Sequence, residues 1–423
     1  MIVKIPYGTK TLDVNVPDGN LLSVIESKEV DRIYDVVAEI KNQLLYPIGA
    51  TPLPELVSGK SSVCIVVSDI TRPVPYKVIL PVMLSVIEES GVSPQDIYFL
   101  VATGLHRACT RDELVEMLGD GVVGEYRILQ HDALDSNSHK FLGYTKRETP
   151  IWVDRRYLEA EVKIITGLVE PHFMAGFSGG RKSIAPGISG LDTIRALHSP
   201  SLLESPNAAI GVVKGNPVHE ETTEIARLAG VDFMLNVTLN KAREITGVFG
   251  GDLDAAFYEA VDFLMSTAVD VAEEADVVIA SGGGYPLDTT FYQSIKGMVA
   301  VLPAVKKGGM VFVASSCTDG VGKKDFEDVL IELGRLKDPD MLVERLKEPD
   351  FFKIDQWQVE EMCKVLKKAD IFYYTEALSP ERVKRFMVTP VSSLSELFDE
   401  ARKRYGKEFT VNIVPEGPYT LLL

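Results

Sequence analysis

Residues 170–187 read EPHFMAGFSGGRKSIAPG, a histidine followed by a glycine-rich loop and an Arg-Lys pair. The stretch comes directly after Val162–Thr166, a run of residues typical of a buried strand. Small residues let backbone N–H groups approach an anion, and a helix beginning near Lys182 would point its positive end at that anion. The glycine spacing does not match a Walker A loop. The loop therefore suggests a cradle for the phosphate of a larger cofactor, although a sharp strand-to-helix turn would explain the glycines by themselves.

The pattern around this loop predicts an α/β fold. Short apolar runs alternate with segments of helical periodicity, which is typical of a parallel sheet with right-handed crossovers. The chain has 423 residues, too many for one ordinary core, and the strand–helix pattern restarts at Val277–Ala280. We therefore expect two α/β domains with mainly parallel sheets and an active site in the cleft between them. The predicted domains are residues 1–270 together with 406–423, and a smaller one at 275–400.

Composition narrows the class of protein. Hydrophobic residues make up 46% of the chain, charged residues 25%, and the net charge is −17. These values are typical of a globular protein and argue against nucleic acid or anionic membranes as partners. No apolar run has the length of a membrane span, and the four cysteines match no zinc or disulfide spacing. We expect a cytoplasmic protein.

Polar clusters follow three of the predicted strands. In such sheets the carboxyl ends of strands meet at one edge, so we expect the clusters to converge on one site. His106 and His172 could act as a general acid and base, and Arg72 offers a fork for a carboxylate or phosphate. The clusters are Asp69/Thr71/Arg72, Thr103/His106/Arg107, and His172 through Lys182.

Other residues leave more than one interpretation open. Lys182 could contact a phosphate, pair with an acid or anchor a cofactor covalently, and His198 could bind a metal, although no second histidine stands at zinc-ligand spacing. The glycines at 282–284 form a second candidate anion loop or a tight turn. Gln293 and Lys296 share a helix face that would suit a small carboxylate, or would simply face solvent. We interpret the remaining histidines, His131, His139 and His219, as structural.

In six segments the chain resembles the nickel-dependent lactate racemase family. The segments are SDITRP at 68–73, ATGLHR at 102–107, the stretch from Pro171 to Lys182, the later His198, GNPVHE at 215–220, and YQSIK at 292–296. The resemblance implies a nickel-pincer nucleotide, nickel pyridinium-3,5-bisthiocarboxylic acid mononucleotide, attached through Lys182 with His198 as the protein ligand of nickel. It also implies a reliance on proteins that synthesise this cofactor.

The resemblance assigns further roles by position. His106 and His172 would be the two acid–bases. Asp69, Ile70, Thr71 and Arg72 would line the cofactor, and the loop interpretation adds Ser178, Gly179 and Gly180. Arg72, Gln293 and Lys296 would bind the substrate. If Tyr292 and Trp357 both line the substrate pocket, they would leave room for little beyond a methyl group on the substrate. Trp357 could equally well be a residue of the hydrophobic core.

The implied reaction interconverts L- and D-lactate. One histidine would take the hydroxyl proton while hydride moves from C2 to the pincer, and a 2-keto acid would form. The hydride would return to the other face, and the second histidine would serve the opposite enantiomer. Alternatives are a racemase or epimerase of another, larger 2-hydroxy acid in the same family, a pyridoxal-phosphate-type Schiff-base enzyme at Lys182, and a non-catalytic nickel or nucleotide carrier.

Overall fold

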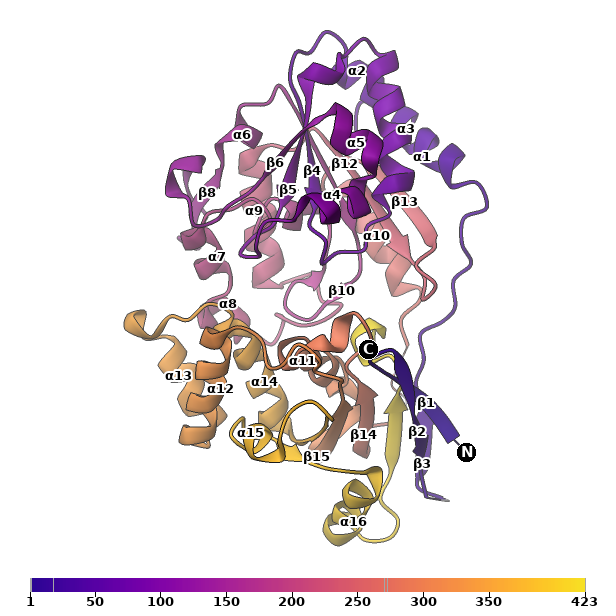
Figure 1. Cartoon of the computed structure of the whole chain (residues 1–423), viewed down its shortest axis with the longest axis vertical. Helices are drawn as coiled ribbons and strands as arrows, with labels where there is room; N and C mark the ends of the chain where they lie inside the picture. The colour runs from indigo at the N-terminus through magenta and orange to yellow at the C-terminus, as the bar shows by residue number, and fades with distance from the viewer. Residues whose placement is uncertain (1, 18, 270, 272, 423) are drawn as a thin grey trace. The chain divides into compact units, whose positions relative to one another are not determined.

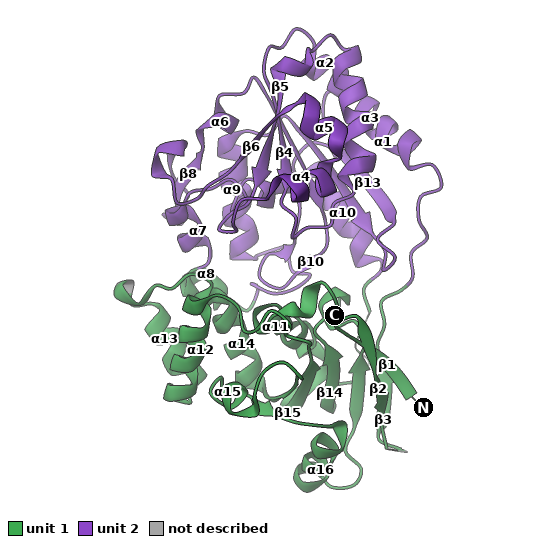
Figure 2. Cartoon of the chain, in the orientation of Figure 1, with its two compact units in different colours: residues 1–28, 199–206, 268–423 green, residues 29–198, 207–267 purple. Residues whose placement is uncertain are grey.

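The computed structural model describes residues 2–17, 19–269, 271 and 273–422. The chain divides into two compact units (Figure 2). Unit 1 comprises residues 1–28, 199–206 and 268–423, and unit 2 comprises residues 29–198 and 207–267. Each unit is built around its own six-stranded sheet.

The sheet of unit 2 is parallel except at one edge (Figure 1). Its order is β13-β12-β9-β4-β5-β6, and only β13 pairs antiparallel with its neighbour. The central strand β4 is rich in β-branched residues and buried on both faces, as strands covered by helices on both sides are. The strands are β4 (Val63–Ser68), β5 (Ile97–Ala102), β6 (Arg127–Gln130), β9 (Val162–Leu168), β12 (Phe233–Leu239) and β13 (Ile245–Gly251).

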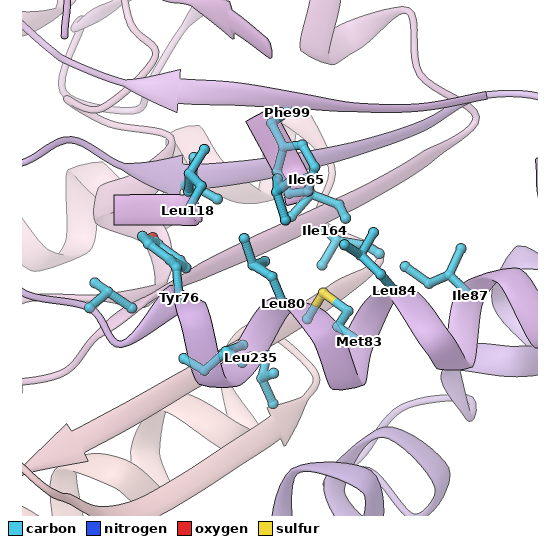
Figure 3. Packing of buried hydrophobic residues seen from close by; sticks show 14 of the residues in the cluster. Ile65, Tyr76, Leu80, Met83, Leu84, Ile87, Phe99, Leu118, Ile164 and Leu235 are labelled. Carbon is cyan, nitrogen blue, oxygen red and sulfur yellow. The ribbon is translucent and has the colours of Figure 1, made fainter. Parts of the chain in front are cut away.

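Helix α3 (Tyr76–Glu89) shows how this sheet is covered (Figure 3). Leu80, Met83 and Ile87 recur at helical spacing and are fully buried. They belong to the same apolar cluster as Ile65 of β4 and Ile164 of β9. Burying each such side chain contributes about 1.5–3 kcal/mol. The other helices of unit 2 are α1 (Val36–Leu45), α2 (Leu53–Val57), α4 (Arg111–Leu118), α5 (Asp120–Glu125), α6 (Arg155–Leu158), α7 (Leu191–Leu197), α9 (Pro217–Ala229) and α10 (Ala255–Met265).

The glycine-rich loop differs from its prediction. Instead of an α-helix beginning near Lys182, the chain makes one short 3-10 turn, η3 (Gly180–Ser183). Pro186 lacks a backbone N–H and disfavours a continuing helix, so the next α-helix is α7. Two short hairpins precede η3 in the chain: β7 (His139–Tyr144) with β8 (Pro150–Asp154), and β10 (Pro171–His172) with β11 (Gly176–Phe177).

Unit 1 holds a second sheet in the order β17-β16-β15-β14-β18-β3, with every pair parallel. At the N-terminus, β1 (Ile2–Tyr7) and β2 (Lys10–Asn15) pair as an antiparallel hairpin. The sheet strands are β3 (Leu21–Val24), β14 (Ala275–Ser281), β15 (Val305–Ala314), β16 (Ala369–Tyr374), β17 (Thr389–Pro390) and β18 (Val411–Val414). The helices are α8 (Pro200–Leu203), α11 (Phe291–Ala300), α12 (Lys324–Leu336), α13 (Pro339–Leu346), α14 (Gln356–Lys368), α15 (Pro380–Lys384) and α16 (Leu394–Tyr405).

The prediction of two α/β domains is confirmed, but the boundaries of the units differ from those predicted. The two ends of the chain, which we expected in the N-terminal domain, belong to unit 1. The physical reason is strand pairing, because Ile413 of β18 lies between Ile279 of β14 and Val24 of β3. Residues 199–206, which contain α8, also belong to unit 1. In the described part of the chain no helix is long and apolar enough to cross a membrane.

Candidate active site

Asp69 and His106 meet at the carboxyl ends of the neighbouring strands β4 and β5. Oδ2 of Asp69 lies 2.7 Å from Nδ1 of His106, while its Oδ1 accepts hydrogen bonds from the hydroxyl and the N–H of Thr71 at 2.6 and 3.2 Å. Burial acts to raise the pKa of Asp69, but the bonds from His106 and Thr71 and the charge of Arg72 lower it below its ordinary value. An ionised carboxylate requires a proton on Nδ1, so the neutral His106 ring presents its lone pair at Nε2.

Arg72 and Glu170 join the loops after β4 and β9. Nη1 of Arg72 donates to Oε1 of Glu170 at 2.5 Å, and both side chains are partly exposed. The guanidinium is therefore matched by a carboxylate rather than presented as an isolated positive charge. Glu170 was not among the predicted site residues, although its place directly before Pro171-His172, at a strand end, was a usable signal.

His172 is held by backbone groups of its own loop. Its Nδ1 accepts hydrogen bonds from the N–H groups of Met174 and Ala175, each at 3.2 Å. The carbonyls of the same two residues are fixed from outside: Asn216 Nδ2 donates to Met174 at 2.9 Å and Arg181 Nη2 to Ala175 at 3.2 Å. The GNPVHE segment thus supports the His172 loop, and Asn216 also caps α9 by accepting two backbone N–H bonds.

Packing and backbone shape account for the glycines of this loop. Gly179 and Gly180 have φ of +76° and +52°, and a side chain on Gly180 would meet Phe257 at 3.0 Å. The hydroxyl of Ser178 donates to the carbonyl of Leu168 at 2.8 Å and accepts the N–H of Glu170 at 3.0 Å. Ser178, Gly179 and Gly180 therefore shape the loop, and a cofactor role for them is left to proposal.

Lys182 and His198 lie close enough to interact electrostatically. Burial, together with the Lys182 charge, lowers the pKa of His198 to about 4, so the ring is neutral at physiological pH. Its Nδ1–H donates to the carbonyl of Ile194 at 2.8 Å, which leaves the lone pair at Nε2. Metal-ligating histidines are commonly set in this way, neutral and with the second nitrogen held by a carbonyl. The two residues fit a metal-bearing group anchored at the lysine.

His198 is not part of a protein metal cluster. Across the residues that the structure describes, no three His, Cys, Asp or Glu side chains are arranged to hold a metal ion. A metal at His198 would need further ligands from a non-protein group.

Other members of the predicted clusters take structural positions. Thr103 is buried and its hydroxyl donates to the carbonyl of His131 at 2.8 Å. Arg107 is exposed and donates twice to Glu113, at 2.8 and 2.6 Å. His131 is buried with Nδ1 3.1 Å from Asp154, which fits the structural role expected for it. Only His106 of the second predicted cluster reaches Asp69.

In unit 1 the predicted substrate residues gather on α11. Tyr292, Gln293 and Lys296 are its only partly exposed positions, while the rest of the helix is buried. Oε1 of Gln293 has no hydrogen-bond partner within the described ranges, so it remains an unused acceptor. Trp357 lies on α14 and is 7% exposed. The next residue, Gln358, donates to the Tyr292 carbonyl at 2.9 Å and ties α14 to α11.

The second glycine loop, at residues 282–284, lies beside a buried acid, Asp288. Gly283 and Gly284 have positive φ and form a turn. The carboxylate of the buried Asp288 accepts the N–H groups of Gly8 and Ser316 at 2.8 and 3.0 Å. A carboxylate in this position favours the tight-turn interpretation over an anion cradle.

These features define a two-domain α/β enzyme with an aspartate–histidine pair and an arginine at the ends of its central strands. Models of the lactate racemase N-terminal domain and the lactate racemase C-terminal domain match residues 7–211 and 270–421. Lactate racemase from Thermoanaerobacterium thermosaccharolyticum is 33% identical over 419 residues, covering 98% of this chain and 97% of that protein. Lactate racemase from Lactiplantibacillus plantarum is 32% identical over 420 residues, covering 98% of each. The chain belongs to the lactate racemase family and is an isomerase.

Solved structures agree with this assignment. The lactate racemase apoprotein from Thermoanaerobacterium thermosaccharolyticum superposes with a TM-score of 0.93 at 32% identity, covering 100% of both chains. A protein from Thermotoga maritima gives a TM-score of 0.69 at 18% identity over 92% of this chain and 98% of that one, a likeness of fold alone.

Proposed function

We propose that the protein racemises lactate with a nickel-pincer nucleotide attached to Lys182. The observation that carries the proposal is the meeting of Asp69 with His106 and of Arg72 with Glu170, at the ends of three adjacent strands. It occurs in a chain that resembles lactate racemases over almost its whole length.

Lys182 and His198 are the residues that would hold the cofactor. A thiocarboxylic acid arm and the Lys182 amine would join as a thioamide with loss of one water, and Nε2 of His198 would bind the nickel. When bound, the group supplies an acceptor that takes the C2 hydrogen of the substrate with its electron pair and gives it back. The neutral state and carbonyl contact of His198 support this role.

The remaining residues would bind the substrate and move its hydroxyl proton. His106, through Nε2, and His172 are proposed as the two acid–bases, one for each enantiomer, and the buried Asp69 would stabilise the imidazolium that forms on His106. Arg72 offers N–H groups to the carboxylate while Glu170 fixes its position. Gln293 and Lys296 are proposed as further contacts of the carboxylate and hydroxyl, since they share one partly exposed helix face.

We propose lactate rather than a bulkier 2-hydroxy acid as the substrate. The two curated relatives carry the name lactate racemase. We propose that the large side chains of Tyr292 and Trp357 limit the space available to the substituent on C2 of the substrate. The ring of Tyr292 packs edge-on against that of Phe326, with 5.1 Å between the ring centroids. A higher kcat/KM for an aryl 2-hydroxy acid than for lactate would contradict the size limit while leaving the racemase chemistry intact.

The proposal is tested by producing the protein together with the cofactor-synthesis proteins. We expect nickel in the purified protein, an intact-mass adduct, and conversion of L-lactate to a racemic mixture. Lys182→Ala should lose the adduct, whereas Lys60→Ala, a change of an exposed lysine on the same unit, should keep it. An equal adduct on Lys182→Ala would reject the anchor. A visible aldimine absorbance without nickel would favour a Schiff-base enzyme, and nickel without turnover of any 2-hydroxy acid would favour a carrier.

A further inference from the structure

His131, which follows β6, makes a hydrogen bond with each nitrogen of its ring. Nδ1 lies 3.1 Å from the carboxylate of Asp154, and Nε2 lies 3.0 Å from the backbone carbonyl of Ser189. The side chains of His131 and Asp154 are both fully buried, so water does not take the place of either contact. The ring therefore joins three segments that are distant in the sequence.

Both partners of the His131 ring are acceptors, since a carboxylate and a carbonyl have no hydrogen to donate. A neutral imidazole carries a proton on only one nitrogen, so it could donate to only one of them. Making both bonds requires a proton on each nitrogen, which makes His131 a buried cation. Burial acts to raise the pKa of Asp154, but the bonds from Arg156 and His131 lower it to about 2, so its carboxylate is ionised and balances this charge.

The other groups around the ring are compatible with a cation. Arg156 also binds Asp154, through Nε at 2.9 Å, and its side chain is partly exposed, so its own charge is partly solvated. The ring of His139 stands edge-on to that of His131, with 5.0 Å between the centroids. Burial lowers the pKa of His139 and the charge of His131 lowers it further, so His139 is the neutral ring of the two.

Ser189, whose carbonyl His131 holds, belongs to the loop that carries Lys182. Within this loop the N–H of Gly187 donates to the carbonyl of Lys182 at 3.1 Å. The hydroxyl of Ser189 donates to the carbonyl of Ile184 at 2.8 Å. The loop is thus bonded to itself between Lys182 and Ser189, and the bond from His131 fixes its far end.

The backbone of His131 holds the loop that carries His106. The carbonyl of His131 accepts the hydroxyl of Thr103 at 2.8 Å, and its N–H donates to the carbonyl of Val101 at 3.1 Å. The N–H of His106 in turn donates to the carbonyl of Thr103 at 2.9 Å. One residue is therefore bonded to both loops, through its ring on one side and its backbone on the other.

Gly104 and Gly187 form a direct bond between the same two loops, with the N–H of Gly104 donating to the carbonyl of Gly187 at 3.0 Å. We propose that His131 is a positioning residue, a doubly protonated ring that holds the loop of Lys182 against the loop of His106. It would keep the cofactor anchor and an acid–base at a fixed separation. Only the effect on turnover rests on the proposed function.

The first test reads the ring in the unchanged protein without cofactor. Nitrogen-15 spectra of the imidazoles at about pH 8, where an ordinary histidine is neutral, are assigned by comparison with His131→Gln and His139→Gln. We expect protons on both nitrogens of His131 and on only one nitrogen of His139. A single proton on His131 would overturn the proposal, whether or not the protein racemises lactate.

The second test measures how fast the Gly104 amide exchanges with deuterium in the solvent. Glutamine has one amide group in place of two ring N–H groups, so in His131→Gln the exchange should accelerate about 10–10²-fold relative to the amides of β4, the equivalent of one hydrogen bond from a charged donor. His139→Gln is the matched control, since that ring is also buried but, in the described part of the chain, bonds only within residues 135–138. Equal exchange in the two variants would contradict the proposal.

Asp154→Asn separates the charge of the ring from its contact with Ser189. The backbone N–H and Nε of Arg156 both donate to Oδ1, so the amide oxygen should stay on that side and the amide NH₂ should face Nδ1 of His131. The ring should then lose the Nδ1 proton, keep the Nε2 proton and still hold Ser189. Exchange of Gly104 as fast as in His131→Gln, with the Nε2 proton still present, would contradict the role of the Ser189 contact.

The last test uses the cofactor-loaded enzyme at matched nickel content. His131→Gln should lower kcat about 10–10²-fold with little change in KM, because displacing the anchor misaligns the reacting groups without removing a substrate contact. His139→Gln should leave kcat near that of the unchanged protein. Equal losses of kcat in the two variants, or a change in KM alone, would overturn the positioning role. Failure of the unchanged protein to racemise lactate would instead reject the proposed function, and the spectra and exchange rates would still decide the role of His131.

Discussion

Nδ1 of His106 lies 2.7 Å from the buried carboxylate of Asp69, and this contact joins the loops of two adjacent strands. It determines which nitrogen of the ring can accept a proton. The same contact explains why Asp69, a buried acid at the end of a strand, stays ionised: the bonds and charges around it lower its pKa against the effect of burial.

Asp69→Asn should therefore reduce the kcat of the loaded enzyme by about 10²–10⁴-fold with a smaller change in KM, because His106 would hold its proton on the wrong nitrogen. Steady-state kinetics in both directions provide the measurement. Asp35→Asn is a matched control, since Asp35 caps α1 and asparagine caps equally well. Unchanged kcat in Asp69→Asn would contradict the role of the pair.

Arg72→Lys should raise KM for lactate by about 10-fold or more. The guanidinium of Arg72 has several N–H groups, so it can bind Glu170 and the proposed substrate carboxylate at the same time. The ammonium group of lysine is a compact charge that lacks this planar arrangement of donors. Arg107→Lys is the control, because Arg107 is exposed and bound to Glu113. Similar KM values for the two variants would remove Arg72 from the substrate site.

Gly176→Ala should destabilise the protein by about 3 kcal/mol or more, since the residue has φ of +76° and a new Cβ would lie 2.2 Å from the Val212 carbonyl. Gly59 has a similar φ of +72° but open space around it, so Gly59→Ala should cost only about 1–2 kcal/mol. Midpoints of denaturant unfolding compare the two. Equal shifts would mean that backbone conformation, rather than the contact with Val212, determines the cost.

Glu360→Gln should stabilise the protein increasingly as pH rises. Burial and the neighbouring Glu361 raise the pKa of Glu360 to about 9 from an ordinary value of 4.5, and neither of its oxygens has a hydrogen-bond partner among the described residues. Between these values the folded state holds a proton that the unfolded state has released, so stability falls as pH increases.

Glutamine removes this dependence, and the difference in Tm between variant and wild type should grow from about pH 4.5 to about pH 9. Glu361→Gln is the comparison: burial raises the pKa of Glu361 only to about 7, so its difference in Tm should grow only up to about pH 7, and the substitution also weakens the contact with Lys364 at 2.7 Å. A constant difference in Tm across this range would show that Glu360 is ionised in the folded protein.

The sequence predicted the central elements of the fold well. β-branched runs such as Val63–Ser68 and the helical spacing of α3 carry strong local signals, and placing the polar residues after strands correctly brought Asp69 to His106. The sequence carries no comparable signal for which strands pair with each other. We therefore did not predict that β18 lies in the second sheet, between β14 and β3.

Side-chain direction was equally hard to predict. Thr103 and Arg107 stand in the same loop as His106 but turn to His131 and Glu113. The sequence does not show that Nδ1 of His106 faces a carboxylate while Nδ1 of His172 faces two backbone N–H groups. Contacts of this kind depend on the folded loop and cannot be read from residue spacing.

The fate of the C2 hydrogen tests the central claim most directly. That hydrogen is very weakly acidic beside an ionised carboxylate, so a histidine base alone faces a large barrier. If it moved as a proton to imidazole it would exchange with water, whereas a hydrogen held with its electron pair returns to the same substrate. C2-deuterated L-lactate racemised in ordinary water should give D-lactate that keeps its deuterium. Loss of the deuterium to solvent would contradict the account, even with the fold and the site as described.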